Sequence, residues 1–126
     1  MRAVDTNVLV RLITRDDDSQ VSSAESFTEK GAWVPMLVLM EATWVLSTVY
    51  ELTANELIRT IEMLLNHRDL VLQDGEIVTG ALETFRARPA LGFTDCLIVE
   101  SARKAGHLPL GTFDKSLSRV EGTQRL

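Results

Sequence analysis

The sequence has few of the residues that cross-link a chain or carry it across a membrane. It contains a single cysteine, Cys96, so no internal disulfide can form, which is typical of a reducing compartment. The longest apolar run, residues 34–40, is far shorter than the roughly 20 residues that cross a bilayer. No basic stretch followed by an apolar segment opens the chain. We therefore expect a cytoplasmic protein.

Positive charge and the usual zinc ligands are also scarce. Lysine and arginine number 13 against 18 aspartates and glutamates, and the net charge of −5 argues against broad nucleic-acid binding through a basic face. It does not exclude nucleic acid as a substrate, because a metal ion can supply positive charge locally. The sequence has no His/Cys cluster for zinc, no P-loop and no G-x-G-x-x-G after a strand, which excludes a dinucleotide site.

Short apolar segments alternate with helical patterns along all 126 residues, and we expect one domain, residues 1–126. The candidate strands are residues 2–4, 32–34, 70–73 and 108–112. Helices are expected at 7–14, from Ser22 or Ser23 to about 31, and at 36–50, 54–66, 75–87 and 94–106. Thr53 and Glu56 form a capping-box pattern at the start of one helix, and Thr94 is a candidate cap of another. Such alternation predicts an α/β layered fold with a central parallel sheet flanked by helices.

Four acids lie near the predicted strand ends or helix starts. Glu41 is the only charge in the apolar stretch "VPMLVLMEATWVLSTVY", and an isolated buried carboxylate has to be paired, protonated or bound to a metal. Asp5 follows the first strand, Asp114 follows the last, and Asp95 opens a helix after a loop. Sites in parallel sheets lie beyond the carboxyl ends of the strands, so the four acids can converge there.

Four carboxylates in one pocket repel each other unless a cation lies among them, and oxygen ligands of this kind suit Mg²⁺ or Mn²⁺. Such a site clamps a phosphate and activates a water for attack on phosphorus. Each acid also has a simpler interpretation: a helix cap or turn residue for Asp5, a first-turn acid for Asp95, a turn residue for Asp114 and an arginine partner for Glu41.

The segment "AVDTNVLVRL" resembles the opening of PIN-domain proteins, specifically the VapC-type ribonuclease toxins of toxin–antitoxin pairs. The helix with Glu41, "FTDCLIVESARKAG" and "LGTFDKSL" follow in the order and spacing of that family. The resemblance covers essentially the whole chain. It implies a three-layer PIN-like fold with a central parallel sheet and a Mg²⁺-dependent endoribonuclease acting on RNA. It also implies a homodimer neutralised by a small antitoxin protein.

The same resemblance assigns roles to individual residues. The acidic quartet of the family matches Asp5, Glu41, Asp95 and Asp114 as catalytic and metal-binding residues, with Asp5 and Asp95 closest to the metal. Asn7 and Thr112 match polar positions that orient those acids. Many relatives carry one more acid where this chain has "LGF" at 91–93, a departure that bears on the occupancy of a second metal.

Other functions remain open at this point. A PIN-fold protein that has lost catalysis and acts only as a binding partner is one alternative, although all four acids are kept. A phosphoacceptor receiver domain is another, but it needs paired acids after the first strand, where Asp5 stands alone. We expect Cys96, Trp33 and Trp44 to be packed in the core. Arg11, Arg15, Arg86, Arg88 and Lys115 are candidate RNA contacts.

Overall fold

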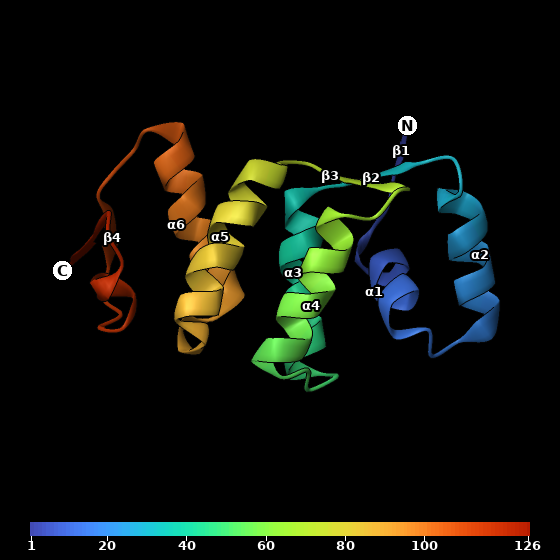
Figure 1. Ribbon diagram of the computed structural model, residues 1–126, viewed down its shortest axis with the longest axis horizontal. Helices are drawn as coiled ribbons and strands as arrows, with labels where there is room; N and C mark the ends of the chain where they lie inside the picture. Colours follow the sequence, from blue (N-terminus) through green and yellow to red (C-terminus); the bar gives the residue numbers. More distant parts are fainter. The chain divides into compact units, whose positions relative to one another are not determined.

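The computed structural model describes residues 1–126 and divides into two compact units, Met1–Gly75 and Glu76–Leu126 (Figure 1). Each unit has its own sheet and its own buried side chains, and each is described by itself. The expectation of one domain over residues 1–126 stays a prediction.

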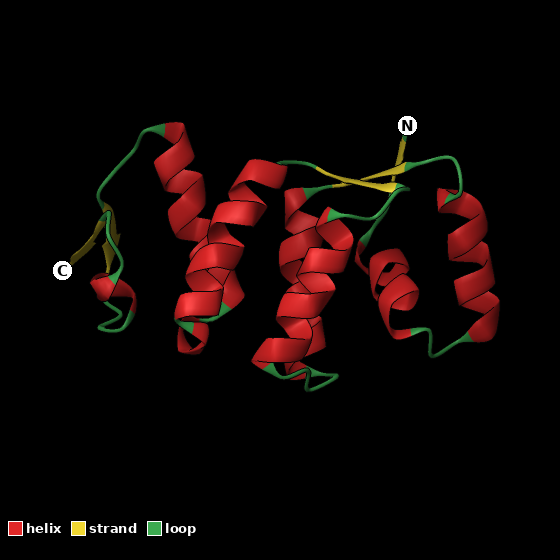
Figure 2. Cartoon of the chain, viewed as in Figure 1, coloured by secondary structure: helices red, strands yellow, loops and turns green.

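The first unit is built on a parallel sheet of three short strands in the order β1-β2-β3 (Figure 2). These are β1 (Arg2–Ala3), β2 (Ala32–Val34) and β3 (Leu70–Leu72), and the register aligns Ala3 with Trp33 and Trp33 with Val71. The helices are α1 (Thr6–Thr14), α2 (Asp18–Thr28), α3 (Met36–Thr48) and α4 (Ala54–Leu65). The α/β class with a parallel sheet is thereby confirmed.

The core of the first unit comes from apolar residues at helical or alternating spacing. In α4, Leu57, Ile61 and Leu64 recur at the i, i+4, i+7 spacing that marks one helix face, and all three are buried. In β2, Ala32 and Val34 are buried while Trp33 between them points to the other face and is 37% exposed. The expectation that Trp33 is packed in the core is therefore wrong.

Helix α3 is apolar along most of its length, yet it is not buried on all sides. Leu39, Ala42 and Leu46 are buried, but Leu37 is 78% and Trp44 is 58% exposed. Glu41 is also exposed. The carboxylate of Glu41 therefore stays hydrated and bears no desolvation cost, so its position does not require a buried partner.

The starts of two helices test the cap predictions in the first unit. The capping box is confirmed: Glu56 N donates to Thr53 Oγ1 at 3.2 Å, and Thr53 N donates to Glu56 Oε1 at 2.9 Å. Helix α2 begins at Asp18 instead of Ser22 or Ser23, because Asp17 accepts a hydrogen bond from Gln20 N at 3.0 Å and caps the helix earlier.

The second unit holds most of α5 (Gly75–Ala87), then α6 (Phe93–Ala105) and a parallel pair of strands, β4 (Leu110–Thr112) and β5 (Thr123–Arg125). Short 3₁₀ turns lie at Pro89–Leu91 and Leu117–Arg119. The strand β5 was not expected. The expected cap at Thr94 is wrong: α6 begins at Phe93, after Gly92 at a φ of 82°, with no side-chain cap. Phe85 and Phe93 pack edge to face at 5.8 Å in the core of this unit.

No helix in the chain combines the length and the apolar character that a membrane crossing requires.

Candidate active site

Asp5 lies just beyond the end of β1 and caps α1. Its Oδ1 accepts a hydrogen bond from Val8 N at 3.1 Å, and its backbone is extended, as a helix cap requires. The side chain is exposed, and Oδ2 accepts no hydrogen bond. The fold therefore holds the carboxylate in place through one oxygen and leaves the other available to a ligand.

Glu41 comes from the neighbouring helix at the same edge of the sheet. Strands β1 and β2 are parallel neighbours, so α1 and α3, which follow them, both begin at the carboxyl edge, and the two helices pack together. Glu41 is the sixth residue of α3, about 8 Å along its axis from Met36. Its carboxylate makes no hydrogen bond and no ion pair, so it too is free to bind a ligand.

The other two acids lie together in the second unit. Asp95 is in the first turn of α6 and is half-buried, while Asp114 is exposed, just beyond β4. Burial raises the pKa of the Asp95 carboxyl, and the negative charge of Asp114 raises that pKa further. The structure thus brings Asp95 and Asp114 close enough for their charges to interact, although 18 residues separate them in the sequence.

A tight turn fixes Asp114. Its backbone N–H donates to Thr112 Oγ1 at 3.0 Å, and its Oδ1 accepts from Ser116 N at 2.8 Å and from Leu117 N at 3.0 Å. Thr112 therefore orients the backbone that carries the acid. Asn7, the other polar residue singled out from the sequence, is exposed beside Asp5 and makes no side-chain hydrogen bond.

The whole sequence was compared with models of known protein families. The model of the PIN domain family matches residues 2–123, which span both units. The chain belongs to the PIN domain family. No curated protein and no solved structure matches the chain. PIN domains are generally nucleases that use divalent metal ions, so the membership supports hydrolysis of nucleic acids.

The acids of this PIN domain have the chemistry that a divalent cation needs. Neither unit alone gathers three or more His, Cys, Asp or Glu side chains that could hold a metal ion. Asp5 and Glu41, in the first unit, have carboxylate oxygens without a partner. Asp95 and Asp114, in the second unit, repel each other. Hard oxygen ligands and unrelieved negative charge suit Mg²⁺ or Mn²⁺.

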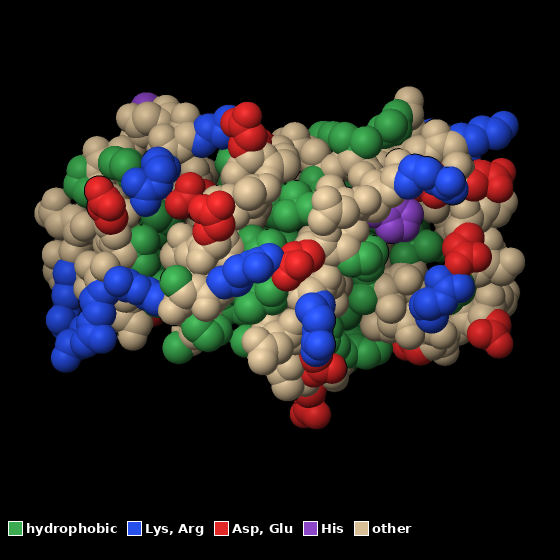
Figure 3. Space-filling model, viewed as in Figure 1, with side chains coloured by type: hydrophobic (Ala, Val, Ile, Leu, Met, Phe, Trp, Pro, Cys, Tyr) green, Lys and Arg blue, Asp and Glu red, His purple; other side chains and the backbone are tan.

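Two of the basic residues considered as RNA contacts are already engaged in this PIN domain. Arg11 donates to Gln20 Oε1 at 2.6 Å, to Tyr50 Oη at 3.1 Å and to Asp16 Oδ1 at 3.2 Å. Arg15 pairs with Glu25 at 2.6 Å. On the face of the first unit that Figure 3 shows, positive and negative side chains lie next to one another and form no positive patch.

Cys96 is a packed residue, as expected. Its side chain is 1% exposed, and burial raises the pKa of its thiol to about 11, with smaller effects from the charges of Asp95 and Glu100. A thiol with this pKa stays protonated at neutral pH and is a poor nucleophile. Trp44, by contrast, is not in the core.

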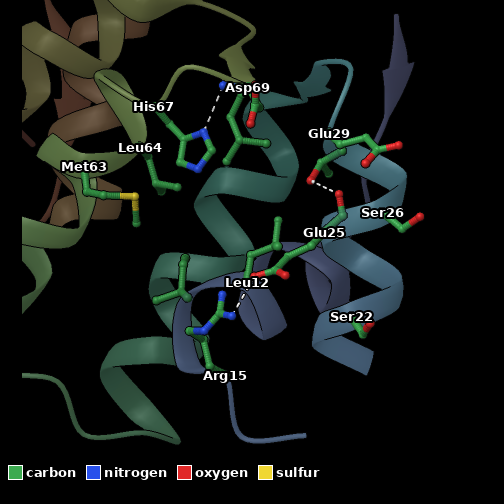
Figure 4. A pocket seen from close by; sticks show the side chains of 13 residues that line it. Leu12, Arg15, Ser22, Glu25, Ser26, Glu29, Met63, Leu64, His67 and Asp69 are labelled. Carbon is green, nitrogen blue, oxygen red and sulfur yellow. Dashed lines mark hydrogen bonds and ion pairs between the residues drawn. The ribbon is translucent and has the colours of Figure 1, made fainter. Parts of the chain in front are cut away.

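A pocket of about 490 Å³ lies at the opposite edge of the first sheet (Figure 4). Asp69 and Leu70, at the start of β3, line it together with the end of α1, which places it at the amino edge of the strands. In it, His67 Nδ1 accepts a hydrogen bond from Asp69 N at 3.0 Å, and Arg15 bonds Glu25. None of the four acids lines this pocket, so its size does not make it the active site.

A second pocket, of about 430 Å³, begins at Asp5 and runs between α1 and α2. Among its lining residues are Gln20 and Phe27, which the sequence did not single out. No sequence motif contains them, because they belong to a polar helix and reach the pocket only through the packing of α2 on α1.

Proposed function

We propose that this PIN domain is a Mg²⁺- or Mn²⁺-dependent endoribonuclease, the toxin of a VapBC-like type II toxin–antitoxin pair, acting in the cytoplasm. The observation that carries the nuclease is the set of four acids, two just beyond strands and two within helices α3 and α6, in a chain that matches the PIN family over residues 2–123. In particular, Asp95 and Asp114 are held so close that their charges repel, an arrangement that a cation stabilises.

In this proposal Asp5, Glu41, Asp95 and Asp114 are the residues that would hold the metal. When bound, the divalent cation supplies positive charge at the scissile phosphate and makes a water molecule more acidic. Asp5 presents its free Oδ2 from a fixed cap, and Thr112 fixes the turn that carries Asp114. Asn7 lies beside Asp5, with an amide free to orient a ligand of that acid.

We further propose that the protein forms a homodimer and that a small antitoxin protein covers its site. The apolar side chains exposed on α3 support such contacts: Leu37 is 78%, Trp44 is 58% and Val49, at the end of the helix, is 67% exposed. A species that remains monomeric at high concentration in light scattering would count against the dimer.

The test of the nuclease uses purified protein and labelled total RNA, with Mg²⁺ or with EDTA, beside Asp5→Asn and Asp95→Asn. We expect cleavage only by the wild-type protein with Mg²⁺, and folded but inactive variants, because both changes remove charge without removing volume. Cleavage by either variant at the wild-type rate would show the site assignment to be wrong. A wild-type protein that binds RNA but never cuts it would indicate a PIN domain that has lost catalysis.

A further inference from the structure

The pocket between α1 and α2 has an apolar floor and a polar rim. Its apolar lining residues are Val8, Ala24 and Phe27; Ala24 is 6% exposed and Phe27 is half-buried. Its rim consists of exposed side chains with amide or hydroxyl groups, at Asn7, Ser19, Gln20 and Ser23. Pockets of this composition bind flat, mostly apolar groups and orient them through a few hydrogen bonds.

The ring of Phe27 is held in place from one side. The guanidinium of Arg2 lies over it, 3.9 Å from the ring centroid, and Arg2 Nη2 donates to the carbonyl of Phe27 at 3.0 Å. Arg2 lines a separate hollow that also includes Phe27, but it does not line the pocket between α1 and α2. Phe27 therefore lines both hollows, and Arg2, which holds its ring, lines only the second of them.

The amide of Gln20 has a fixed orientation. Arg11 Nε donates to Gln20 Oε1 at 2.6 Å, and a guanidinium can only donate, so the amide NH₂ of Gln20 is the group left over for another partner. Arg11 cannot turn away easily, because it also bonds Asp16 and Tyr50, and Tyr50 in turn donates to Asp16 at 2.9 Å. The pocket thus presents an oriented hydrogen-bond donor on its rim.

The charges of the lining argue against a phosphate in this pocket. The only basic residue there is Arg11, whose guanidinium is already bonded to a carboxylate, a phenol and an amide. The only acid is Asp5, at the mouth of the pocket, which repels an anion unless a cation lies between them. A neutral aromatic group needs no free cation in the pocket and is not repelled by Asp5, and the phosphate next to it can lie on the metal.

We propose that this pocket binds an unpaired nucleobase of the RNA next to the scissile phosphate, with Gln20 as the residue that selects the base through an acceptor on its edge. This inference rests on the proposed ribonuclease function, because Asp5 places the pocket beside the phosphate. Proteins that read RNA sequence do so mostly on unstacked bases, held against aromatic rings and hydrogen-bonded at their edges. The substrate is therefore single-stranded RNA, or a loop, at the nucleotide that flanks the cut.

The first test uses short RNA oligomers in which each nucleotide beside the mapped cut is replaced in turn by an abasic one. We expect one such replacement to lower kcat/KM about ten-fold or more, as the loss of one stacked base does. Gln20→Glu keeps the oxygen that accepts from Arg11 but replaces the donor by an acceptor. It should abolish the preference for one base at that position, so that oligomers carrying each of the four bases there are cut with equal kcat/KM.

Two further variants test whether the loss of base preference comes from the pocket and not from the added charge. Gln124→Glu, on the exposed strand β5, adds the same charge and should keep the wild-type base preference. Ala24→Leu should fill the pocket and equalise the cleavage of intact and abasic oligomers while the far-ultraviolet circular dichroism stays that of the wild type. Equal kcat/KM of the wild-type protein for intact and abasic oligomers at every flanking position would overturn the proposal.

A binding experiment without metal keeps the inference separate from the nuclease. Four 2′-O-methyl pentanucleotides, one for each base, are titrated into isotope-labelled protein in EDTA and followed by amide NMR. Shifts concentrated at Ala24 and Phe27, and absent at His67 and Asp69 in the other pocket, are expected even if no RNA is ever cut. If no shift appears at Ala24 and Phe27 with any of the four, the pocket does not bind a base, whether or not the protein is a nuclease. A wild-type protein that does not cut RNA, yet shows the localised shifts, would overturn the nuclease alone.

Discussion

Burial raises the pKa of the Asp95 carboxyl, and the negative charge of Asp114 nearby raises that pKa further. Asp95 lies in the first turn of α6 and Asp114 lies just beyond β4, so two separate elements of the second unit bring like charges together. Proteins seldom keep such repulsion unless something offsets it, and perturbed carboxylates are common at functional sites. The relationship is also directly measurable in the protein without metal.

Replacing Asp114 by Asn should lower the pKa of Asp95 toward that of an ordinary aspartate. Asn keeps an oxygen that can accept from Ser116 N and Leu117 N, so the turn should persist. The pKa is read from the carboxyl carbon of Asp95 in an NMR titration without metal. Glu121→Gln, whose charge does not contribute to the shift, serves as the control. An unchanged pKa in Asp114→Asn would contradict the proximity of the two acids.

The same pair has a consequence for stability as a function of pH. The pKa of Asp95 is higher in the folded than in the unfolded chain, so the folded protein binds more protons between the two values. The free energy of unfolding therefore falls as pH rises through that window. Above this window, Asp114→Asn should raise the free energy of unfolding by less than about 1 kcal/mol, because Asp114 is exposed. Below the window it should leave the free energy of unfolding unchanged. Urea unfolding on both sides of the window measures the difference.

Two substitutions of Asp5 should separate its structural from its chemical role. Asn caps a helix about as well as Asp, so Asp5→Asn should unfold at nearly the wild-type urea concentration, whereas Asp5→Ala should lose about 1 kcal/mol. Both should lose RNA cleavage by at least about 100-fold, more than the loss of a residue that merely orients a metal ligand. If Asp5→Asn cuts normally while Asp5→Ala does not, Asp5 acts only as a cap.

Thr112 should affect cleavage through Asp114. Thr112→Val removes the oxygen that accepts from Asp114 N at 3.0 Å while keeping the shape of the side chain. We expect roughly a 10-fold loss of cleavage, recovered at higher Mg²⁺ concentration because the loosened acid binds the cation more weakly. Thr112→Ser restores the oxygen and should restore the rate. A loss in Thr112→Val that does not respond to Mg²⁺ would indicate a structural role alone.

The one-domain prediction can be tested because each unit carries its own probe. Both tryptophans, Trp33 and Trp44, lie in the first unit, and the only thiol, Cys96, is buried in the second. If the chain unfolds as one domain, tryptophan fluorescence and thiol labelling should share one urea midpoint. Leu97→Ala removes a buried side chain of the second unit. It should then lower the free energy of unfolding by the same amount with either probe, about 2–5 kcal/mol. Two separate midpoints would mean that the units unfold independently.

Much of the secondary structure followed from local sequence. The capping box at Thr53 and Glu56 and the strand at 32–34 rest on patterns a few residues long, and the structure has both. The start of α2 and the strand β5 were missed. The first depended on which of several polar residues caps the helix, and the second on a pairing with β4 that no local pattern encodes.

By itself, the sequence determined that this is an α/β chain of the PIN family with acids at strand ends and helix starts, because these features depend on neighbouring residues. Only the tertiary structure decided that Glu41 is exposed, that Asp95 and Asp114 repel each other, and that Gln20 and Phe27 share a pocket with Asp5. Exposure, charge coupling and cavities depend on which elements pack side by side. Such packing brings together residues that are distant in the sequence, and no short sequence pattern encodes these contacts.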